Sequence, residues 1–520
     1  EAETLAYFQA LFADHLQGAE LLTRAGGWRN FPNIHCARWH HKNMVILGDA
    51  AHTAHFSIGS GTKLAMEDAI VLADALDGPG DVPTRLAAYD AARRPDVEKL
   101  QKVARTSQAW FEHVAWFMGQ DPLSFSFNLL TRSRRIGYAE LQKRDPALLA
   151  QVQASFAASC GQKAHIPPAF TPFTIGKLQL SNRIVVSPMC QYSAEEGVPN
   201  DWHLVHLGSR ATGGAGLIIA EATAVSPEGR ITPGCTGMYH QDHVAGWKRV
   251  TDFVHRHSAA KIGLQIGHAG RKAGYSRPWE GDRPLSEPWK RLAPSALPWN
   301  AQSPTPEAVD EADMDRIEAA FVWSALAAAR AGFDVLELHM AHGYLLSTFL
   351  SPLTNLRTDA YGGDVHGRLR YPLRILRAVR RVWTGPLFVR LSTTEWAPGG
   401  TTDVERRAIG LAMKEAGADL LDCSAGGVVA HQRPDYGRMF QVPFAEQLRY
   451  EAGIPVMAVG AISEVDQINS LVAAGRADLC ALARKHLYDP AFALHAAAEL
   501  GVEVAWPVQY RAAAPAHRKG

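Results

Sequence analysis

The chain has 520 residues, too many for one ordinary domain, and we expect two. Hydrophobic residues make up 47% and charged residues 20%, as in a globular protein with a large core. Lys and Arg number 53 against 52 Asp and Glu, and this balance argues against nucleic acid or an anionic membrane as a partner.

No apolar run reaches the about 20 residues that cross a bilayer, and residues 1–4 are acidic, unlike the start of a signal peptide. The six cysteines are scattered and form no CxxC motif. This pattern argues against a disulfide framework and against a cysteine-bound metal or iron–sulfur cluster. It predicts a protein of the reducing cytoplasm, with no metal site.

Residues 1–150 have a mostly helical pattern, interrupted by one strand-like passage. We expect residues 44–47 to form a buried strand that ends in GDAAH and is followed by a glycine loop and a helix. These motifs resemble the second FAD motif of aromatic flavoprotein hydroxylases. The resemblance implies that Asp49 binds the ribityl chain of FAD, while Gly59 and Gly61 direct a helix N-terminus toward the flavin. A role in packing alone is the alternative for this loop.

Residues 52–69 carry this motif in the form HTAHFSIGSGTKLAMEDA. This form resembles the one in enzymes that hydroxylate CoA thioesters of salicylate or aminobenzoate. Those enzymes are natural fusions of a hydroxylase with an old yellow enzyme module. No GxGxxG motif precedes Asp49, so the ADP half of FAD lacks a Rossmann cradle. We therefore expect residues 1–150 to be the C-terminal fragment of an FAD monooxygenase domain from a longer bifunctional protein, and we predict that this chain neither holds FAD tightly nor hydroxylates a substrate.

A linker is predicted at residues 151–168, which are rich in Ala, Ser and Gln and end in Ile-Pro-Pro. From residue 169 to 520, short apolar runs alternate with helical stretches, which is typical of βα units around a parallel sheet. The eight candidate strands are 183–187, 217–221, 262–267, 334–339, 387–392, 419–424, 455–460 and 478–483. This number predicts an α/β fold with a (β/α)8 TIM barrel; an open doubly wound sheet is the alternative.

The active sites of such barrels lie at the C-terminal ends of the strands. Four segments at or near these ends carry the motifs SPMCQYS, LQIGHAGRKA, FDVLELHMAHGYLLSTFLSPLTNLRTDAYGG and GPLFVRLS. Together they resemble the old yellow enzyme family, in its branch with a cysteine beside the flavin. The longest insertion, at 273–300, carries three tryptophans and several prolines, and we expect it to cover the site; a merely structural loop is the alternative.

The resemblance implies an FMN site. Arg390 would stabilise the negative charge of the reduced flavin, and Gln265 would bind the pyrimidine edge of the ring. The remaining FMN contacts are Ser187, Pro188, Met189, Cys190, Ala222, Gly460, Ala483 and Arg484, the last three around the phosphate. The family usually has glycine where Ala483 stands, so that contact is the least secure.

The resemblance also implies the catalytic and substrate-binding residues. His339 and His342 would donate hydrogen bonds to a substrate carbonyl oxygen, and Tyr344 would protonate the α-carbon. Cys190 would tune the flavin, and Tyr192 would contact the substrate. A structural role in the core is the alternative for Cys190, the two histidines and Tyr344, and water could replace Tyr344 as the acid. Zinc is not expected, because the two histidines end a strand and lack the glutamate of HExxH.

The implied reaction is hydride transfer from NAD(P)H through FMN to a C=C bond conjugated to a carbonyl. In the full-length protein the substrate would derive from an aryl-CoA thioester, and its reduction would be paired with FAD-dependent hydroxylation. A general ene-reductase with a non-catalytic N-terminal interaction module is the alternative. The tail PVQY at 507–510 resembles that of family dimers and predicts a homo-oligomer, although Arg511 stands one position earlier than expected for the arginine that reaches a neighbouring site.

Overall fold

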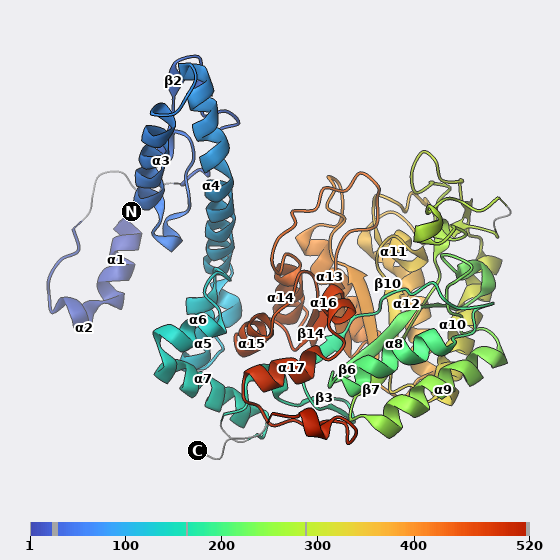
Figure 1. The fold of residues 1–520 in the computed structure, drawn as a ribbon. Coiled ribbons are helices and arrows are strands. Elements are labelled where there is room, and N and C mark those ends of the chain that lie inside the picture. Colours follow the sequence, from blue (N-terminus) through green and yellow to red (C-terminus); the bar gives the residue numbers. More distant parts are fainter. Residues whose placement is uncertain (1, 23–29, 163–164, 287–288, 516–520) are drawn as a thin grey trace. The chain divides into compact units, whose positions relative to one another are not determined.

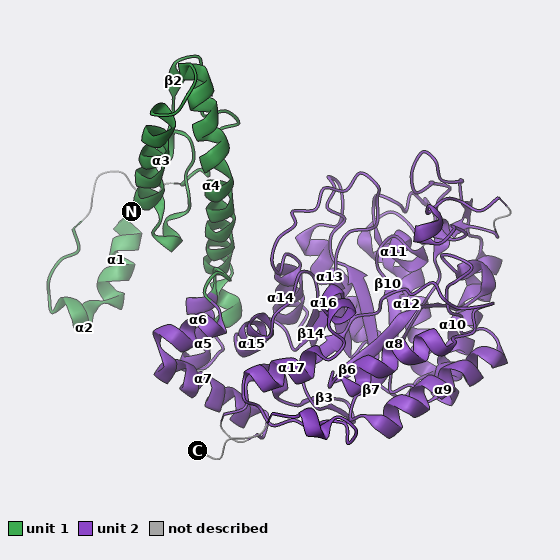
Figure 2. Ribbon diagram, in the orientation of Figure 1, with its two compact units in different colours: residues 1–117, 132–136 green, residues 118–131, 137–520 purple. Residues whose placement is uncertain are grey.

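A computed structural model describes residues 2–22, 30–162, 165–286 and 289–515. The chain forms two compact units (Figure 2). The first contains residues 1–117 and 132–136, and the second contains residues 118–131 and 137–520. Within the described residues, no helix has both the length and the apolar character needed to span a membrane.

The first unit is mainly helical. Its elements are α1 (Ala2–Leu11), α2 (Ala13–Leu16), β1 (His40–His41), β2 (Met44–Val45), η1 (Gly48–Ala50), η2 (Phe56–Ile58), α3 (Gly61–Leu76), α4 (Val82–Glu112) and η3 (Val114–Phe117). A small core of Trp39, Leu64, Tyr89 and Val97 joins α3 and α4 to the segment around β1 and β2.

The strand predicted at 44–47 is shorter and less buried than expected. Strand β2 pairs with β1 in a two-stranded antiparallel sheet, and Met44 is 63% exposed. The apolar run therefore does not lie inside a larger sheet within the described part of the unit. The prediction of a buried strand was wrong because an apolar run shows preference for burial but does not supply the neighbouring strands that would bury it.

A buried charge network holds the GDAAH turn. Asp68 is completely buried on α3; it accepts a hydrogen bond from the Gly48 amide at 2.9 Å and lies 2.7 Å from the His52 ring. Arg93 on α4 donates to the same carboxylate at 2.7 Å. The carboxylate thus fixes both ends of the turn, leaving Asp49 exposed between them.

The second unit is built on a closed parallel barrel of eight strands (Figure 1). They are β5 (Ile184–Val186), β6 (Leu217–Ala224), β7 (Lys261–Gly267), β10 (Val335–Met340), β11 (Leu387–Ser392), β12 (Leu420–Ser424), β13 (Val456–Ala458) and β14 (Leu479–Leu482). Each overlaps one of the predicted strands, and β14 pairs with β5 to close the barrel. The predicted (β/α)8 fold is confirmed, and the open sheet is excluded.

Helices cover the barrel from outside. They are α8 (Asp201–Thr212), α9 (Gln241–His257), α10 (Glu311–Ala331), α11 (Leu345–Leu350), α12 (Val365–Val382), α13 (Asp403–Glu415), α14 (Val442–Glu451), α15 (Val465–Ala473), α16 (Arg484–Tyr488) and α17 (Phe492–Glu499). Because helices cover the outer face and side chains fill the lumen, the strands are buried on both faces, which explains their nearly continuous apolar runs.

The lumen changes from apolar to polar along the strands. At its N-terminal end Val185, Leu217, Phe388 and Met457 form a cluster, against which the β3–β4 hairpin packs. The strands of this hairpin are Phe173–Ile175 and Leu178–Leu180. Two residues further along their strands, the inward positions carry polar groups such as Ser187 and Arg390. The hairpin thus seals the apolar end, and the site lies at the polar end.

Three helices that precede the barrel in the chain pack with it: α5 (Pro122–Thr131), α6 (Tyr138–Arg144) and α7 (Pro146–Ser159). Asn128 donates to the carbonyl of Ala474 at 3.0 Å, and the buried Arg476 donates back to the Asn128 carbonyl at 3.0 Å. The compact units therefore divide ahead of the domain boundary predicted at residue 150. Residues 151–159 of the predicted linker are helical, and residues 163 and 164 lie outside the described part.

Candidate functional site

Three aromatic rings meet at the C-terminal end of β10. The rings of His339 and His342 have centroids 5.1 Å apart, and the rings of His339 and Tyr344 have centroids 4.8 Å apart, both in edge-to-face arrangements. Burial, with the positive charge of Arg390 as a second cause, holds the pKa of both histidines well below its usual range. Both imidazoles are therefore neutral, and each carries a single N–H.

The hydrogen bonds assign that N–H in each ring. Nδ1 of His339 accepts from the Ala341 amide at 3.2 Å, so the proton of His339 is on Nε2. This Nε2 lies 3.3 Å from Nδ1 of His342, which must accept, and so Nε2–H of His342 donates to Oγ of Ser424 at 2.7 Å. The result is a relay in which the His339 N–H is the group that can turn to an incoming carbonyl oxygen.

Lys272 fixes the second histidine. His342 has a φ of 61°, a left-handed backbone conformation that residues other than glycine seldom adopt. The Lys272 ammonium donates to the His342 carbonyl at 2.8 Å and to the Gly427 carbonyl at 2.5 Å, and lies 3.5 Å from the ring centroid of Trp299. Burial, followed by the positive charge of Arg271, lowers its pKa to about 7. Lys272 thus ties the loops after β7, β10 and β12 together beside the ring cluster.

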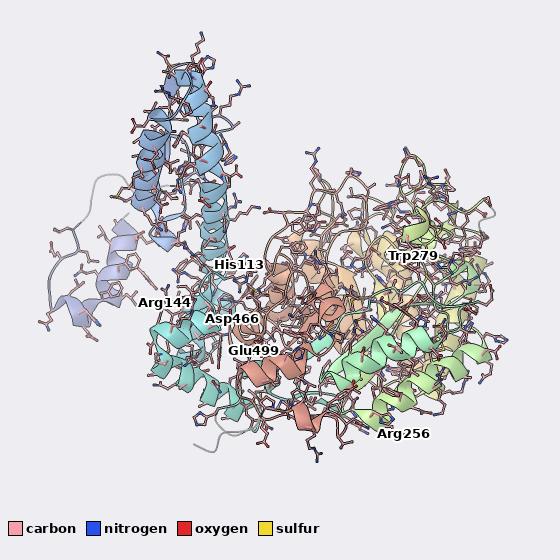
Figure 3. The ribbon with its side chains drawn as sticks, in the orientation of Figure 1. His113, Arg144, Arg256, Trp279, Asp466 and Glu499 are labelled. Carbon is pink, nitrogen blue, oxygen red and sulfur yellow. The ribbon has the colours of Figure 1, made fainter. Side chains whose placement is uncertain are left out.

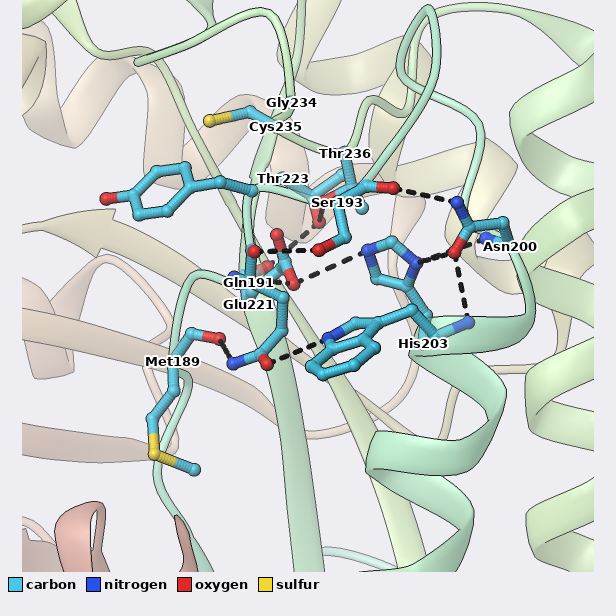
Figure 4. Close-up of polar contacts among 12 residues, drawn as sticks. Met189, Gln191, Ser193, Asn200, His203, Glu221, Thr223, Gly234, Cys235 and Thr236 are labelled. Carbon is cyan, nitrogen blue, oxygen red and sulfur yellow. Dashed lines mark hydrogen bonds and ion pairs between the residues drawn. The ribbon is translucent and has the colours of Figure 1, made fainter. Parts of the chain in front are cut away.

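The loop after β5 is held by a buried glutamate (Figure 4). Glu221 on β6 accepts from the Gln191 amide at 3.1 Å, and its carboxyl lies 3.6 Å from Nε2 of His203. Burial raises the pKa of Glu221 to about 8 and lowers that of His203 to about 4. This loop carries Cys190, whose pKa burial raises well above its usual range, so the thiol is protonated.

Arg390 and Gln265 project into the polar part of the lumen. An Arg390 Nη1–H donates to Ser187 Oγ at 3.3 Å, and Gln265 Nε2–H donates to Glu337 at 2.7 Å. The four residues come from β11, the end of β5, β7 and β10. The strand register therefore brings three of the predicted flavin contacts, Arg390, Gln265 and Ser187, to one level of the lumen.

The predicted phosphate contacts follow β13 and β14. Gly460 has a φ of 107°, and Ala483 precedes the first turn of α16, which begins with the exposed Arg484. The described residues include no hydrogen-bond acceptor for the Arg484 guanidinium.

These residues fit FMN. Buried polar atoms without a hydrogen-bond partner among the described residues include Nε of Arg390 and Oε1 of Gln441. A buried polar atom of this kind is unfavourable unless a ligand or water pairs with it. A Cβ at Gly460 would approach Cδ of Gln441 to 2.9 Å, so glycine keeps the backbone open there. A planar heterocycle with polar edges, ending in a phosphate, matches this set of donors, acceptors and open backbone.

Substituting Gly460 with alanine should weaken FMN binding and lower the free energy of unfolding by about 1–3 kcal/mol, because a side chain is strained at this φ. Chemical denaturation and the FMN content after gel filtration measure the two effects. Gly437→Ala is the matched control, since no atom lies within 4 Å of its added Cβ. Equal FMN content and stability in the two variants would contradict the role of Gly460.

The aromatic insertion lies over neighbouring loops. Trp279, which is 66% exposed, is labelled in Figure 3, and its ring centroid lies 6.2 Å from that of Tyr192. The Arg277 guanidinium donates to the Tyr192 carbonyl at 2.9 Å. Ala222, His339 and Tyr344 line one pocket below these loops. Residues 287 and 288 of the insertion lie outside the described part.

In the first unit, Asp49 is exposed within η1, and Gly59 has a φ of 62° just before α3. A Cβ at Gly59 or at Gly61 would meet no atom within 4 Å. The surface around the three predicted FAD contacts is therefore open.

Four site residues were not assigned a role from the sequence: Glu221, Lys272, Glu337 and Asp422. Glu221, Glu337 and Asp422 are single acidic residues within otherwise apolar runs that become strands with two buried faces. Charged residues are almost never fully buried unless they are paired, and this was the signal that could have found them. Lys272 lies next to a motif arginine, and nothing in its neighbours indicated burial.

Comparison with known proteins gives two family matches. Residues 168–503 match the model described as the NADH:flavin oxidoreductase / NADH oxidase family. Residues 25–104 match a model described as an FAD binding domain.

Individual relatives match the barrel. The NADPH dehydrogenase of Geobacillus thermodenitrificans is 45% identical over 343 residues, which is 66% of this chain and 97% of that protein. The NADPH dehydrogenase of Bacillus subtilis is 43% identical over 343 residues, again 66% of this chain and 97% of that protein. Among solved structures, morphinone reductase is 28% identical with a TM-score of 0.55, covering 65% of this chain and 91% of its own. A 2-naphthoyl-CoA reductase complex has a TM-score of 0.57 at 23% identity, covers 62% of this chain and 51% of its own, and shows the fold alone.

Proposed function

This chain belongs to the NADH:flavin oxidoreductase / NADH oxidase family, to which old yellow enzyme belongs, and on that basis we propose that its barrel reduces a C=C bond conjugated to a carbonyl. FMN is the cofactor of the barrel, and NADPH is the proposed reductant, supported by relatives that are NADPH dehydrogenases with 40 to 45% identity. The observation that carries the proposal is the grouping of His339, His342 and Tyr344 beside the lumen that holds Arg390 and Gln265.

When bound, FMN supplies the hydride transfer between nicotinamide and substrate. The residues of the chain orient the substrate and polarise its carbonyl group. In the proposed complex the N–H of His339 leaves His342 and donates to the substrate carbonyl oxygen, stabilising the negative charge that develops there. A neutral imidazole suits this role because it donates without requiring a counterion inside a buried site.

Tyr344 carries the proton that the substrate would receive. Removal of its phenol from water raises its pKa well above the ordinary value of about 10, so it stays protonated throughout the range in which the enzyme works. Its ring lies in edge-to-face contact with the ring of His339, the group proposed to hold the carbonyl oxygen. We propose that it protonates the α-carbon.

Tyr344→Phe should slow reoxidation of the reduced protein by an enone about 10²-fold, the lower end of the usual contribution of a general acid. Stopped-flow measurement of this step in both proteins gives the comparison; Tyr344 itself stays protonated, because its pKa is raised well above its ordinary value of about 10. An unchanged rate in Tyr344→Phe would exclude the phenol as the acid.

For the substrate we propose an intermediate derived from an aryl-CoA thioester, and we propose that its reduction is paired with FAD-dependent hydroxylation. The presence of an FAD binding domain match in the same chain supports this pairing. A general ene-reductase, with the first unit as an interaction module, is the second candidate; the 43 to 45% identity to stand-alone barrel proteins favours it. We also propose a homo-oligomer.

The two candidates differ in which compound reoxidises the reduced flavin. Simple enones and dearomatised aryl-CoA or enoyl-CoA compounds are mixed in turn with the reduced protein. Faster reoxidation by the thioesters supports the first candidate. If simple enones react and thioesters do not, the thioester assignment is wrong and the second candidate stands.

A further inference from the structure

The polar level of the barrel lumen contains two carboxyl groups and a single guanidinium. Glu337 on β10 and Asp422 on β12 are fully buried, and Arg390 on β11, the strand between them, is 7% exposed. The register places Arg390 directly beside Asp422, while Glu337 lies beside Gln265 on β7. Acidic side chains are rarely buried to this degree without a partner for each charge.

The neighbouring residues provide hydrogen bonds or ion pairs to only some of the carboxyl oxygens of Glu337 and Asp422. Gln265 donates to Oε1 of Glu337 at 2.7 Å, and Nε of Arg390 lies 3.3 Å from Oδ2 of Asp422. Oε2 of Glu337 and both carboxylate oxygens of Asp422 have no hydrogen-bond donor among the described residues, so the contact of Asp422 with Arg390 is an ion pair only. Ionised carboxylates only accept hydrogen bonds, so two ionised groups here would leave one negative charge unbalanced in a volume closed to water.

We propose that Glu337 and Asp422 share a single proton and thereby set the net charge of the polar lumen that would hold the flavin. With this proton present, one carboxylate remains, the guanidinium balances it, and the cluster is neutral. Without it, the cluster has a net charge of −1. The two carboxyls are positioning residues that act through Gln265 and Arg390, and the inference rests on the proposed FMN site.

The surrounding charges agree with this assignment. Burial, and then the charge of Asp422, raises the pKa of Glu337 to about 8, although Arg390 and Gln265 oppose the shift. Burial also raises the pKa of Asp422, against the lowering effect of Arg390. The other residues at this level are Ser187 on β5 and Gln265 on β7, which do not titrate here, and His339, which is neutral.

The proton links flavin reduction to pH. Below about pH 8 the shared proton is present in both redox states; above it, the oxidised protein loses the proton and the cluster becomes negative. Reduced flavin carries negative charge near Arg390, and this charge raises the pKa of the pair further. Each two-electron reduction above about pH 8 should therefore draw one additional proton from solvent onto the pair.

The test is the pH dependence of the flavin midpoint potential of the holoprotein, measured spectroelectrochemically from about pH 6 to pH 10, on both sides of the raised pKa. The native protein should take up one more proton per reduction above about pH 8 than Glu337→Gln or Asp422→Asn at the same pH. Glu446→Gln, which removes a buried carboxyl on α14 outside the lumen, should behave like the native protein. Equal proton uptake in native protein and Glu337→Gln, both with bound FMN, would overturn the inference.

A second measurement needs no variant. Above about pH 8, the reduced-minus-oxidised infrared difference spectrum of the native protein should gain the C=O stretch of a protonated carboxylic acid, shifted in D2O. Absence of that band would overturn the shared proton even if both variants failed to fold. Failure of the native protein to bind FMN would instead contradict the proposed function, so the two failures are distinguishable.

Discussion

His339→Ala should slow reoxidation of the reduced protein by an enone about 10²–10³-fold, the usual cost of losing one donor to a developing oxyanion. The hydrogen-bond relay makes this residue more sensitive than His342. The Ala341 amide fixes the proton of His339 on Nε2, while the N–H of His342 is already engaged by Ser424. Stopped-flow measurement at saturating substrate gives the rate of this step.

His339→Asn is the matched variant for that experiment, because its side-chain amide retains an N–H donor at a similar position. It should recover a substantial part of the lost rate, and both variants should contain as much FMN as the native protein. A His339→Ala rate within about twofold of the native rate would mean that the carbonyl oxygen is held elsewhere.

Arg390→Met should lower the free energy of unfolding of the apoprotein by about 3–5 kcal/mol, the usual cost of leaving a buried charge without its partner. Methionine preserves most of the side-chain length but removes the cation beside Asp422. The same change removes the cation predicted to stabilise the negative charge of the reduced flavin, and FMN should be lost on gel filtration. Denaturation is measured without FMN because bound ligand itself stabilises the folded state.

The double variant Arg390→Met with Asp422→Asn separates the loss of stability from the loss of FMN binding. It removes the unpaired carboxylate together with the guanidinium, so part of the stability should return while FMN binding remains weak. If the double variant is less stable than Arg390→Met alone, the carboxylate is not the source of the cost, and packing of the guanidinium must explain it.

The barrel was predictable because strands buried on both faces appear as short, nearly continuous apolar runs. Strand β11 was predicted to the residue, and β12 and β14 within one residue at each end. The β3–β4 hairpin was not predicted, because its strands have three residues each and only their inward side chains are apolar. The association of α5–α7 with the barrel also escaped prediction, since it depends on contacts such as Arg476 to Asn128, 348 residues apart in the chain.

The candidate site was predictable where its residues belong to a single sequence motif. The residues His339, His342 and Tyr344 lie within the short segment 339–344 at a single strand end, and their rings do meet. The Glu337 and Asp422 pair was not predictable, because the two residues are 85 positions apart and their proximity depends on the register of three strands. In the first unit, the GDAAH turn was recognised, but the environment of its apolar run was not.

The flavin content of the purified chain tests the proposed site most directly. After denaturation, the released flavin is identified and counted by chromatography. We expect one FMN per chain, lost in Arg390→Met and reduced in Gly460→Ala; FAD found in addition would show that the first unit also binds flavin. A native protein that neither retains FMN nor binds it when FMN is added would contradict the proposed function.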